Sequence, residues 1–277
     1  YSLYASILFR LEHPHSPIKY FHSYINQKKK NVILQQILIM KYKKVLLKLS
    51  GESLMGDDNY SIDYQRVKHF ADEIKSATTL GVQMGVVIGG GNIFRGLNGA
   101  GKGFDRRQGD YMGMLATLIN AMALQNVLQE IGVKAKVLSA ITIEPVCEKT
   151  YYIKALQYMQ EGYVVIFGGG TGNPFFSTDS GAALRALEIK ADLLIKGTRV
   201  NGIYTADPEK DPTAIKYDTL SFQEAYEKNL KIMDLTAFTL CKDNKMPICV
   251  YNANDKGSLI KVLKGEKVGT FLHSDIE

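Results

Sequence analysis

Three glycine-rich segments, each after a short apolar run, are the strongest candidates for chemistry in this sequence. They are Lys48-Leu49-Ser50-Gly51-Glu52, GGGNIFRG at residues 89–96 and GGGTGNPFFSTD at residues 168–179. Glycine lets the backbone approach an anion closely, and a helix amino terminus behind the turn adds positive potential. One glycine turn alone is most often only a tight turn. Three of them, each after a predicted strand, favour phosphate binding.

Two cations beside these turns suit phosphoryl transfer. Lys48 ends the first apolar run, where an ammonium group can neutralise charge on a transferring phosphate. Arg95 follows the second glycine triplet, where a guanidinium group can bind a phosphate through two hydrogen bonds. The ordinary alternatives are a strand lysine like Lys43 or Lys44 and a solvated loop arginine.

Several aspartates stand close to the same segments. Asp110, Asp179 and Asp234 each fall at the start of a predicted helix, where capping alone would explain them. Asp207 and Asp211 precede prolines, where turn formation is the alternative. Acids and cations around glycine turns together predict phosphoryl transfer, in which catalysis is mainly positioning and charge stabilisation.

Other phosphate and hydrolase motifs fit poorly. The segment 96–103 nearly matches GxxxxGK[ST], but Gly103 stands at the hydroxyl position and no strand directly precedes Gly96. The dinucleotide pattern GxGxxG fails at the glycine turns, and GxSxG and HExxH are absent from the sequence. We therefore predict no resident metal ligands.

Short apolar runs alternate with helical patterns from residue 41 onward. Strands are expected at 43–49, 82–88, 133–138, 163–167, 192–196 and 248–251. Helices are expected at about 63–79, 110–131, 150–161, 178–190, 221–228, 235–245 and 257–263. Ser221 and Glu224 form a capping box, and Gly81, Gly132 and Gly162 stop helices before strands. Apolar strands between helices are buried on both faces, which predicts an α/β fold: a three-layer α/β/α sandwich with a mostly parallel central sheet.

Composition excludes several classes of protein. The 277 residues carry a net charge of +6, but residues 1–39 hold five basic residues against one acidic, a balance of +4, which leaves +2 for the rest. That distribution predicts no nucleic-acid partner. No apolar run of about 18 residues is evident, so no membrane span is expected. Three cysteines without a CxxC motif indicate a reducing, cytoplasmic location.

The first 39 residues differ in composition from the rest. They hold three of the five histidines and the lysine run 28–30, and Met40 immediately precedes the strand-like KYKKVLLKLSGE. We expect the working protein to start near Met40 and residues 1–39 to be a non-native or dispensable extension. A targeting peptide is the alternative.

The ordered motifs of residues 41–272 resemble the bacterial UMP kinase (uridylate kinase) family, which has the amino-acid-kinase fold. The segments that carry the resemblance are KVLLKLSGESLMG, GVVIGGGNIFRG, GDYMGMLATLINAMAL, GGGTGNPFFSTDSGAALRALEI, NGIYTADPEKDPTA and KIMDLTAFTLCKDNKMPICVYN. The resemblance implies one domain at 40–277, with a UMP-binding lobe at about 40–165 and an ATP-binding lobe at about 166–277. It implies ATP + UMP → ADP + UDP in pyrimidine nucleotide biosynthesis, with Mg²⁺ carried mainly by the nucleotide phosphates. It also implies a cytoplasmic homohexamer that GTP activates and UTP inhibits.

The resemblance also assigns roles to individual residues. It implies catalytic roles for Lys48, Arg95, Asp179 and Asp234, with Lys196 as a second phosphate cation. The residues implied to bind ATP are Lys48, Leu49, Ser50, Gly51, Gly91, Arg95, Thr198, Tyr204 and Asp207. Those implied to bind UMP are Gly90, Asp110, Thr171, Gly172, Asn173, Pro174, Phe175, Phe176, Ser177 and Thr178.

One residue departs from the family pattern, and two other functions remain open. Asn201 stands where the family often has aspartate, so it keeps the turn but loses the charge. A carbamate, aspartate or glutamate kinase is the rival enzyme, although such a kinase would not need the long GTGNPFFSTD loop. The rival outside enzymes is a nucleotide-binding or metal-storage module that has lost catalysis.

Overall fold

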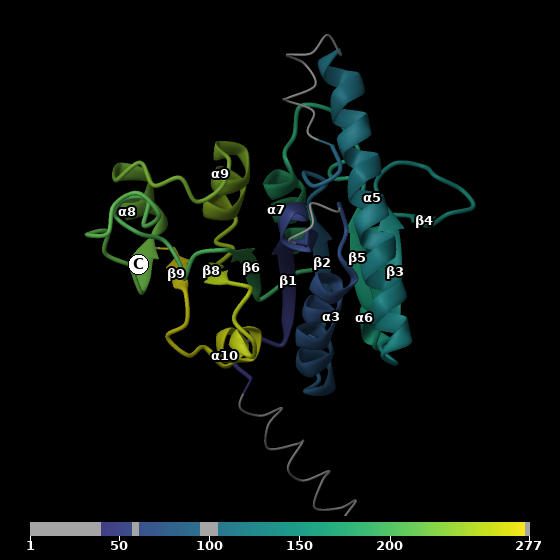
Figure 1. Cartoon of the computed structure of the whole chain (residues 1–277), viewed down its shortest axis with the longest axis horizontal. Coiled ribbons are helices and arrows are strands. Elements are labelled where there is room, and N and C mark those ends of the chain that lie inside the picture. The colour runs from purple at the N-terminus through teal and green to yellow at the C-terminus, as the bar shows by residue number, and fades with distance from the viewer. Residues whose placement is uncertain (1–39, 57–60, 95–104, 275–277) are drawn as a thin grey trace, which may run out of the picture. The chain divides into compact units, whose positions relative to one another are not determined.

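One sheet organises the chain from residue 41 onward, where the residues form a single compact unit. The computed structural model describes residues 40–56, 61–94 and 105–274. Within these ranges the strands are β1 (Lys44–Leu49), β2 (Gln83–Ile88), β3 (Ala135–Ser139), β4 (Glu148–Lys149), β5 (Val164–Gly168), β6 (Leu193–Thr198), β7 (Thr219–Ser221), β8 (Ile248–Asn252) and β9 (Thr270–His273). Their order across the sheet is β4-β3-β5-β2-β1-β6-β8-β9-β7 (Figure 1).

The sheet is parallel except where β9 runs antiparallel to β8. The six strands expected from apolar runs are confirmed, and their side chains are mostly buried because helices cover both faces. The strands β4, β7 and β9 were not predicted. They have only two to four residues each, too few for an apolar pattern.

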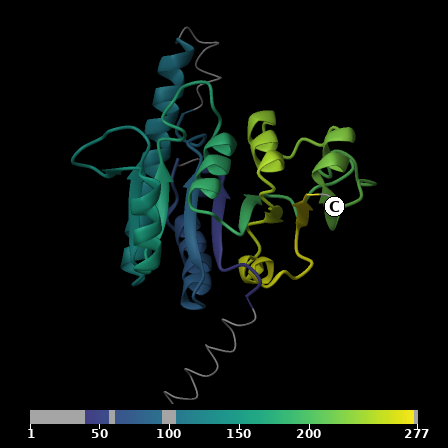
Figure 2. The ribbon, with the colours of Figure 1, turned by 180° about the vertical axis from the view of Figure 1, so that it is seen from behind.

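Helices pack on both faces of the sheet, as Figures 1 and 2 show from opposite sides. One layer has α3 (Tyr64–Thr79), α5 (Arg106–Glu130) and α10 (Ser258–Lys264), and a short 3-10 helix, η1 (Gly51–Leu54), lies beside α3. The other layer has α6 (Tyr152–Gln160), α7 (Thr178–Glu188), α8 (Phe222–Glu227) and α9 (Leu235–Asp243), which share one apolar core with the sheet. The predicted three-layer α/β/α sandwich is confirmed.

The predicted helix signals are also present. Gly81, Gly132 and Gly162 have φ of 79°, 82° and 82°, the left-handed conformation that ends a helix at glycine. The capping box of Ser221 and Glu224 forms at the start of α8.

The start of α5 differs from the prediction. The helix begins at Arg106, and Asp105 caps it by accepting hydrogen bonds from the N–H groups of Arg107 and Gln108. Asp110 therefore lies in the second turn of α5, so the proposal that Asp110 is merely a capping residue is wrong.

The expectation about membrane spans needs a correction at α5. By length and composition alone, this one helix among the described residues could cross a membrane, and half of its most apolar window is buried inside the protein. It packs on β3, β5 and α3, as a core helix does. Its outer surface carries exposed apolar side chains, which we call the α5 stripe: Tyr111, Met112, Leu115, Ile119 and Met122.

Candidate active site

The first two glycine turns meet at the carboxyl ends of β1 and β2. A Cβ atom added to Gly51 would lie 2.5 Å from the carbonyl oxygen of Gly89 and would collide with the side chain of Asn92. No other residue type fits at Gly51 without a shift of the second turn. Both turns thus lie together at the carboxyl-terminal end of the central strands, as a parallel sheet predicts.

The inner side of α5 holds the second and third glycine turns. The buried Asn120 donates a hydrogen bond of 2.7 Å to the carbonyl oxygen of Gly89. The hydroxyl of Thr117 accepts one of 2.8 Å from the N–H of Gly169. A Cβ atom on Gly90 would lie 2.7 Å from that of Ala116, so this turn also lies directly against the helix.

A largely buried ionic cluster joins three predicted charged residues. Lys48 lies 2.8 Å from Oδ1 of Asp179, and Lys196 lies 2.7 Å from Oδ2 of the same carboxylate. Lys196 also donates a hydrogen bond of 2.6 Å to the carbonyl oxygen of Ile232. The side chain of Asp179 therefore does more than stand at a helix start, and Ser177 is the residue that caps α7.

Burial and charge act in opposite directions on this cluster. Burial works to raise the pKa of Asp179, but the positive charges of Lys48 and Lys196 outweigh it and hold the pKa below its usual range. Burial lowers the pKa of Lys196, and the nearby Asp179 offsets only part of that effect. Asp179 is thus an ionised anchor for two ammonium groups.

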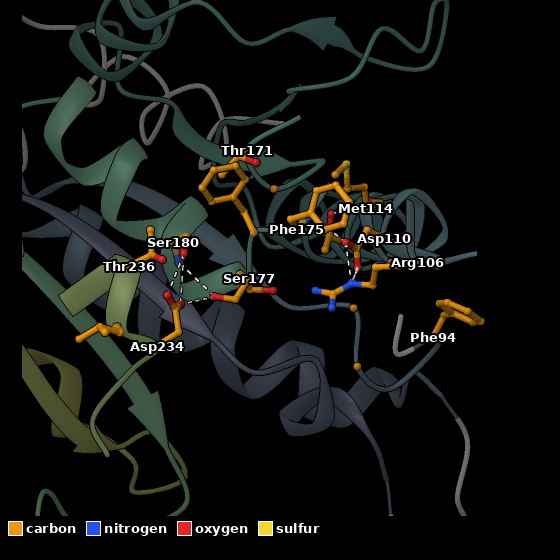
Figure 3. Close-up of a pocket in the computed structure, with 18 residues that line it drawn as sticks. Phe94, Arg106, Asp110, Met114, Thr171, Phe175, Ser177, Ser180, Asp234 and Thr236 are labelled. Atoms are coloured by element: carbon orange, nitrogen blue, oxygen red, sulfur yellow. Dashed lines mark hydrogen bonds and ion pairs between the residues drawn. The ribbon is translucent and has the colours of Figure 1, made fainter. Parts of the chain in front are cut away.

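Asp234 has the capping role that the sequence suggested and a second role as well. It caps α9 by accepting a hydrogen bond of 3.0 Å from the N–H of Ala237. It also accepts hydrogen bonds from the hydroxyls of Ser180, at 3.0 Å, and Ser177 (Figure 3). The starts of α7 and α9 are therefore tied together, with both helix amino termini at one place.

Asp110 links α5 to the third glycine-rich segment. Its Oδ2 accepts a hydrogen bond of 2.7 Å from the N–H of Phe175, and Nε of Arg106 lies 3.0 Å from both carboxylate oxygens (Figure 3). Phe175 has φ of 74°, a conformation that is uncommon for a residue other than glycine. Asp110 therefore holds a strained point of the loop.

Asp110 and Asp234 line a first cavity of about 530 Å³. Seven predicted UMP-binding residues line it: Gly90, Asp110, Thr171, Phe175, Phe176, Ser177 and Thr178. Asn173 lines an adjoining cavity of about 630 Å³, and Gly172 lies against Ala140. Pro174 lines neither of these two cavities. The first cavity draws residues from both predicted lobes.

A second cavity of about 580 Å³ lies at the carboxyl end of β6. It is lined by the predicted ATP-binding residues Thr198, Tyr204 and Asp207, and by Lys196. Asp207 also closes a turn, because its carboxylate accepts a hydrogen bond from the N–H of Glu209. Gly202, which follows Asn201, approaches the backbone at Gly269 and Thr270 closely.

Not every predicted residue lies in these cavities. Leu49 is fully buried in the core, and Ser50 and Gly51 line neither the first nor the second cavity. Gly91, expected on the ATP side, lines the first cavity. Arg95 lies outside the described residues.

The ionic cluster reaches the second cavity directly and the first only through its neighbours along the chain, and Lys48 and Asp179 themselves line neither cavity. Lys196 lines the second cavity, while Thr178 and Ser180, on either side of Asp179, line the first. Lys196 can therefore meet an anion bound in the second cavity. Among the residues that the structure describes, no group of three His, Cys, Asp or Glu side chains is placed to hold a metal ion.

Sequence reasoning missed four residues that shape the site: Arg106, Thr117, Asn120 and Ser180. Arg106 and Asp110 are spaced i and i+4, which usually indicates only a surface ion pair on a helix. Thr117 and Asn120 are polar residues inside an apolar helix, and such residues need partners when they are buried. The presence of Thr117 and Asn120 in an apolar helix could therefore have been recognised from the sequence.

Comparisons with known proteins agree with this geometry. Residues 43–252 match the model of the amino acid kinase family. The chain is 57% identical to the uridylate kinase of Porphyromonas gingivalis over 231 residues, which cover 83% of this chain and 97% of that protein. It is also 57% identical to the uridylate kinase of Parabacteroides distasonis, covering 84% and 99%.

A solved structure is similar throughout the fold. The UMP kinase of Bacillus anthracis superimposes with a TM-score of 0.82 at 36% identity, covering 85% of this chain and 97% of that one. The chain belongs to the amino acid kinase family and, within it, to the uridylate kinases.

Proposed function

We propose that this protein transfers the γ-phosphoryl group of ATP to UMP, with UMP in the first cavity and ATP in the second. The observation that carries the proposal is the cluster of Lys48, Lys196 and Asp179, in which Lys196 lines the second cavity and Asp179 lies between two residues that line the first. The relatives named uridylate kinases, at 57% identity over nearly their whole length, support the choice of UMP as acceptor.

The reaction needs positioning and charge stabilisation more than proton transfer. The phosphate of UMP has a second pKa of about 6, so an anionic oxygen is available at neutral pH without a general base. That oxygen forms a bond to the γ-phosphorus as the bond from phosphorus to the bridging β,γ-oxygen breaks. Lys48 and Lys196 stabilise the charge that spreads over the transferring group. Asp179 holds both ammonium groups in place.

Asp110 supplies the ribose contact in this proposal. Its carboxylate lies on the wall of the first cavity and can accept a hydrogen bond from a ribose hydroxyl. Gly90 and Gly91 line the same cavity, and glycine lets the backbone come close to the phosphate of UMP. Thr171, Phe176 and Thr178 enclose the remainder of the nucleoside.

Mg²⁺ enters as part of the ATP substrate. Both oxygens of Asp179 face lysines, and both oxygens of Asp234 accept hydrogen bonds from serines, so neither acid offers an open ligand set. The residues fit a metal ion that the nucleotide phosphates carry and that balances their charge.

The exposed apolar side chains of the α5 stripe support self-association, which the proposed homohexamer requires. Met112, Leu115, Ile119 and Met122 recur at intervals of three and four residues, and each is between 37% and 49% exposed. Such spacing makes an apolar seam on one side of a helix, which a second copy of the chain can cover. Activation by GTP and inhibition by UTP are part of the same proposal and rest on the family resemblance.

A coupled ADP-release assay tests the proposed reaction. The full chain is given ATP and Mg²⁺ with UMP, CMP, AMP, carbamate or aspartate, and a reaction without acceptor measures background hydrolysis. We expect UMP to give the largest kcat/KM, and repeating the assay with GTP or UTP tests the effectors. Release that depends on carbamate or aspartate but not on UMP would contradict the proposal.

A further inference from the structure

We propose that Arg106 is a positioning residue that fixes the Asp110 carboxylate and so sets the preference for UMP over dUMP. The inference rests on the proposed function, because it assumes that Asp110 meets the ribose. The i, i+4 spacing of Arg106 and Asp110 alone would suggest only an ion pair on the helix surface. Arg106 lines the first cavity, and its side chain is 39% exposed, against 12% for Asp110.

The hydrogen bonds of Asp110 leave little freedom to its carboxylate. Each carboxylate oxygen has about two acceptor positions. The single Nε–H of Arg106 is shared between Oδ1 and Oδ2, each 3.0 Å away, and Oδ2 also accepts from the N–H of Phe175 at 2.7 Å. Oδ1 therefore keeps the more open acceptor position. Arg106 thus presents a defined acceptor on Oδ1 to the cavity.

Arg106 also acts on the loop that Asp110 binds. The centre of its guanidinium group lies 5.8 Å from the centroid of the Phe175 ring, within the range of a cation–π contact. Phe175 is 64% exposed and has φ of 74°, so Arg106 and Asp110 together hold a loop residue that is strained and little buried. Loss of Arg106 would release the carboxylate and the loop together.

Arg107 provides a matched control on the same turn of α5. Its guanidinium group pairs with Asp105 at 3.0 Å, its side chain is 68% exposed, and it does not line the first cavity. Removing its charge changes the helix and the net charge as Arg106→Gln does, but leaves Asp110 untouched.

The test compares Arg106→Gln, Arg106→Lys and Arg107→Gln with the unchanged protein on UMP and dUMP. For Arg106→Gln we expect the ratio of kcat/KM for UMP over dUMP to fall by ~10-fold, mainly through KM for UMP, as the loss of one charge-assisted hydrogen bond implies. The value of kcat at saturating UMP should change less than about threefold, because Lys48 and Asp179 are intact. Arg106→Lys should keep part of the ratio, and Arg107→Gln all of it.

A double variant separates a role through Asp110 from a direct contact with the substrate. If Arg106 acts through Asp110, then Arg106→Gln with Asp110→Asn should have the same ratio as Asp110→Asn alone. Equal losses on UMP and dUMP, an unchanged ratio, or additive effects in the double variant would overturn the inference. Melting temperatures check that each variant is folded. If the unchanged protein shows no UMP-dependent ADP release, it is the proposed function that fails.

Discussion

Lys48 and Lys196 occupy paired positions on the neighbouring strands β1 and β6, and they bind opposite oxygens of one carboxylate. Two ammonium groups side by side would repel each other, and Asp179 between them compensates only one of the two charges. The cluster therefore keeps one positive charge, fixed in a largely buried place where screening by water is weak. In the proposed reaction this charge is in place before the phosphoryl group arrives.

Lys48→Ala should lower kcat by ~10²–10³ while KM for UMP changes little, because removal of one preorganised charge contact acts on the transition state. Steady-state kinetics with UMP varied at saturating ATP measure both constants. Lys43→Ala is the control, since Lys43 precedes the same strand and is exposed. Near-normal turnover of a folded Lys48→Ala protein would leave Lys48 as an ordinary strand lysine.

Asp110→Asn should reduce the preference for UMP over dUMP, which we expect to be ~10–150 in kcat/KM for the unchanged protein. The amide lacks the charge that strengthens a bond to a ribose hydroxyl. The matched control is Asp105→Ala, which removes the cap of α5 and should cost about 0.5–2 kcal/mol of stability while keeping the ratio. A ratio that Asp110→Asn leaves unchanged would remove Asp110 from the site.

Glu148 should contribute stability that disappears in acid. Hydrogen bonds from Lys154 and Lys136 hold the pKa of Glu148 at about 2, below its ordinary value of 4.5. Because the pKa is lower in the folded state, the contribution is complete above 4.5 and is lost as the pH falls toward 2. The difference in melting temperature between the unchanged protein and Glu148→Gln should shrink over that range.

The exposed Glu209 is the control for that measurement. Glu209→Gln should give a difference near zero at every pH. The effect at Glu148 is expected to be small, because the ion pairs are partly exposed and water screens them. A difference that grows as the pH falls would contradict the assigned sign.

Ile119→Glu should reduce the oligomer that the α5 stripe supports, because it places a charge in the middle of the apolar seam. Light scattering coupled to size exclusion gives the mass of the particle. Ile215→Glu is the control, since Ile215 is 69% exposed but lies outside α5. The same mass for the unchanged protein and for Ile119→Glu would place the interface elsewhere.

A chain that begins at Met40 should match the full chain in melting temperature and in kcat/KM for UMP. The motivation is the break in composition before Met40, together with relatives that this chain covers to 97% and 99% of their length with only 231 and 233 of its residues. Surface changes are usually worth within ±0.5 kcal/mol. A loss of stability above ~2 kcal/mol would show that residues 1–39 pack on the rest.

The elements predicted from sequence were those whose signal is local. Long apolar runs predicted the central strands, and Gly81, Gly132 and Gly162 predicted where helices stop. The strand β9 pairs with β8 and β7. A four-residue segment is too short for its own sequence to predict that pairing. Lys48 and Asp179 could be listed as candidates, but their pairing depends on the fold.

The roles of polar residues on α5 were the hardest to predict. Whether Arg106 binds Asp110 or water depends on the loop at Phe175, which comes from a different part of the chain. The helix was expected to begin at Asp110, where an acid suits a helix start, yet Asp105 supplies the cap. Phe175 has a positive φ although it is not glycine, so its sequence does not predict that conformation. Its contacts with Asp110 and Arg106 hold it.

The two cavities have no lining residue in common. With UMP in the first cavity and ATP in the second, as proposed, neither nucleotide has to cross the chamber of the other. In the same proposal only the phosphoryl group passes between the two cavities, and each product can leave from the side on which its parent nucleotide entered.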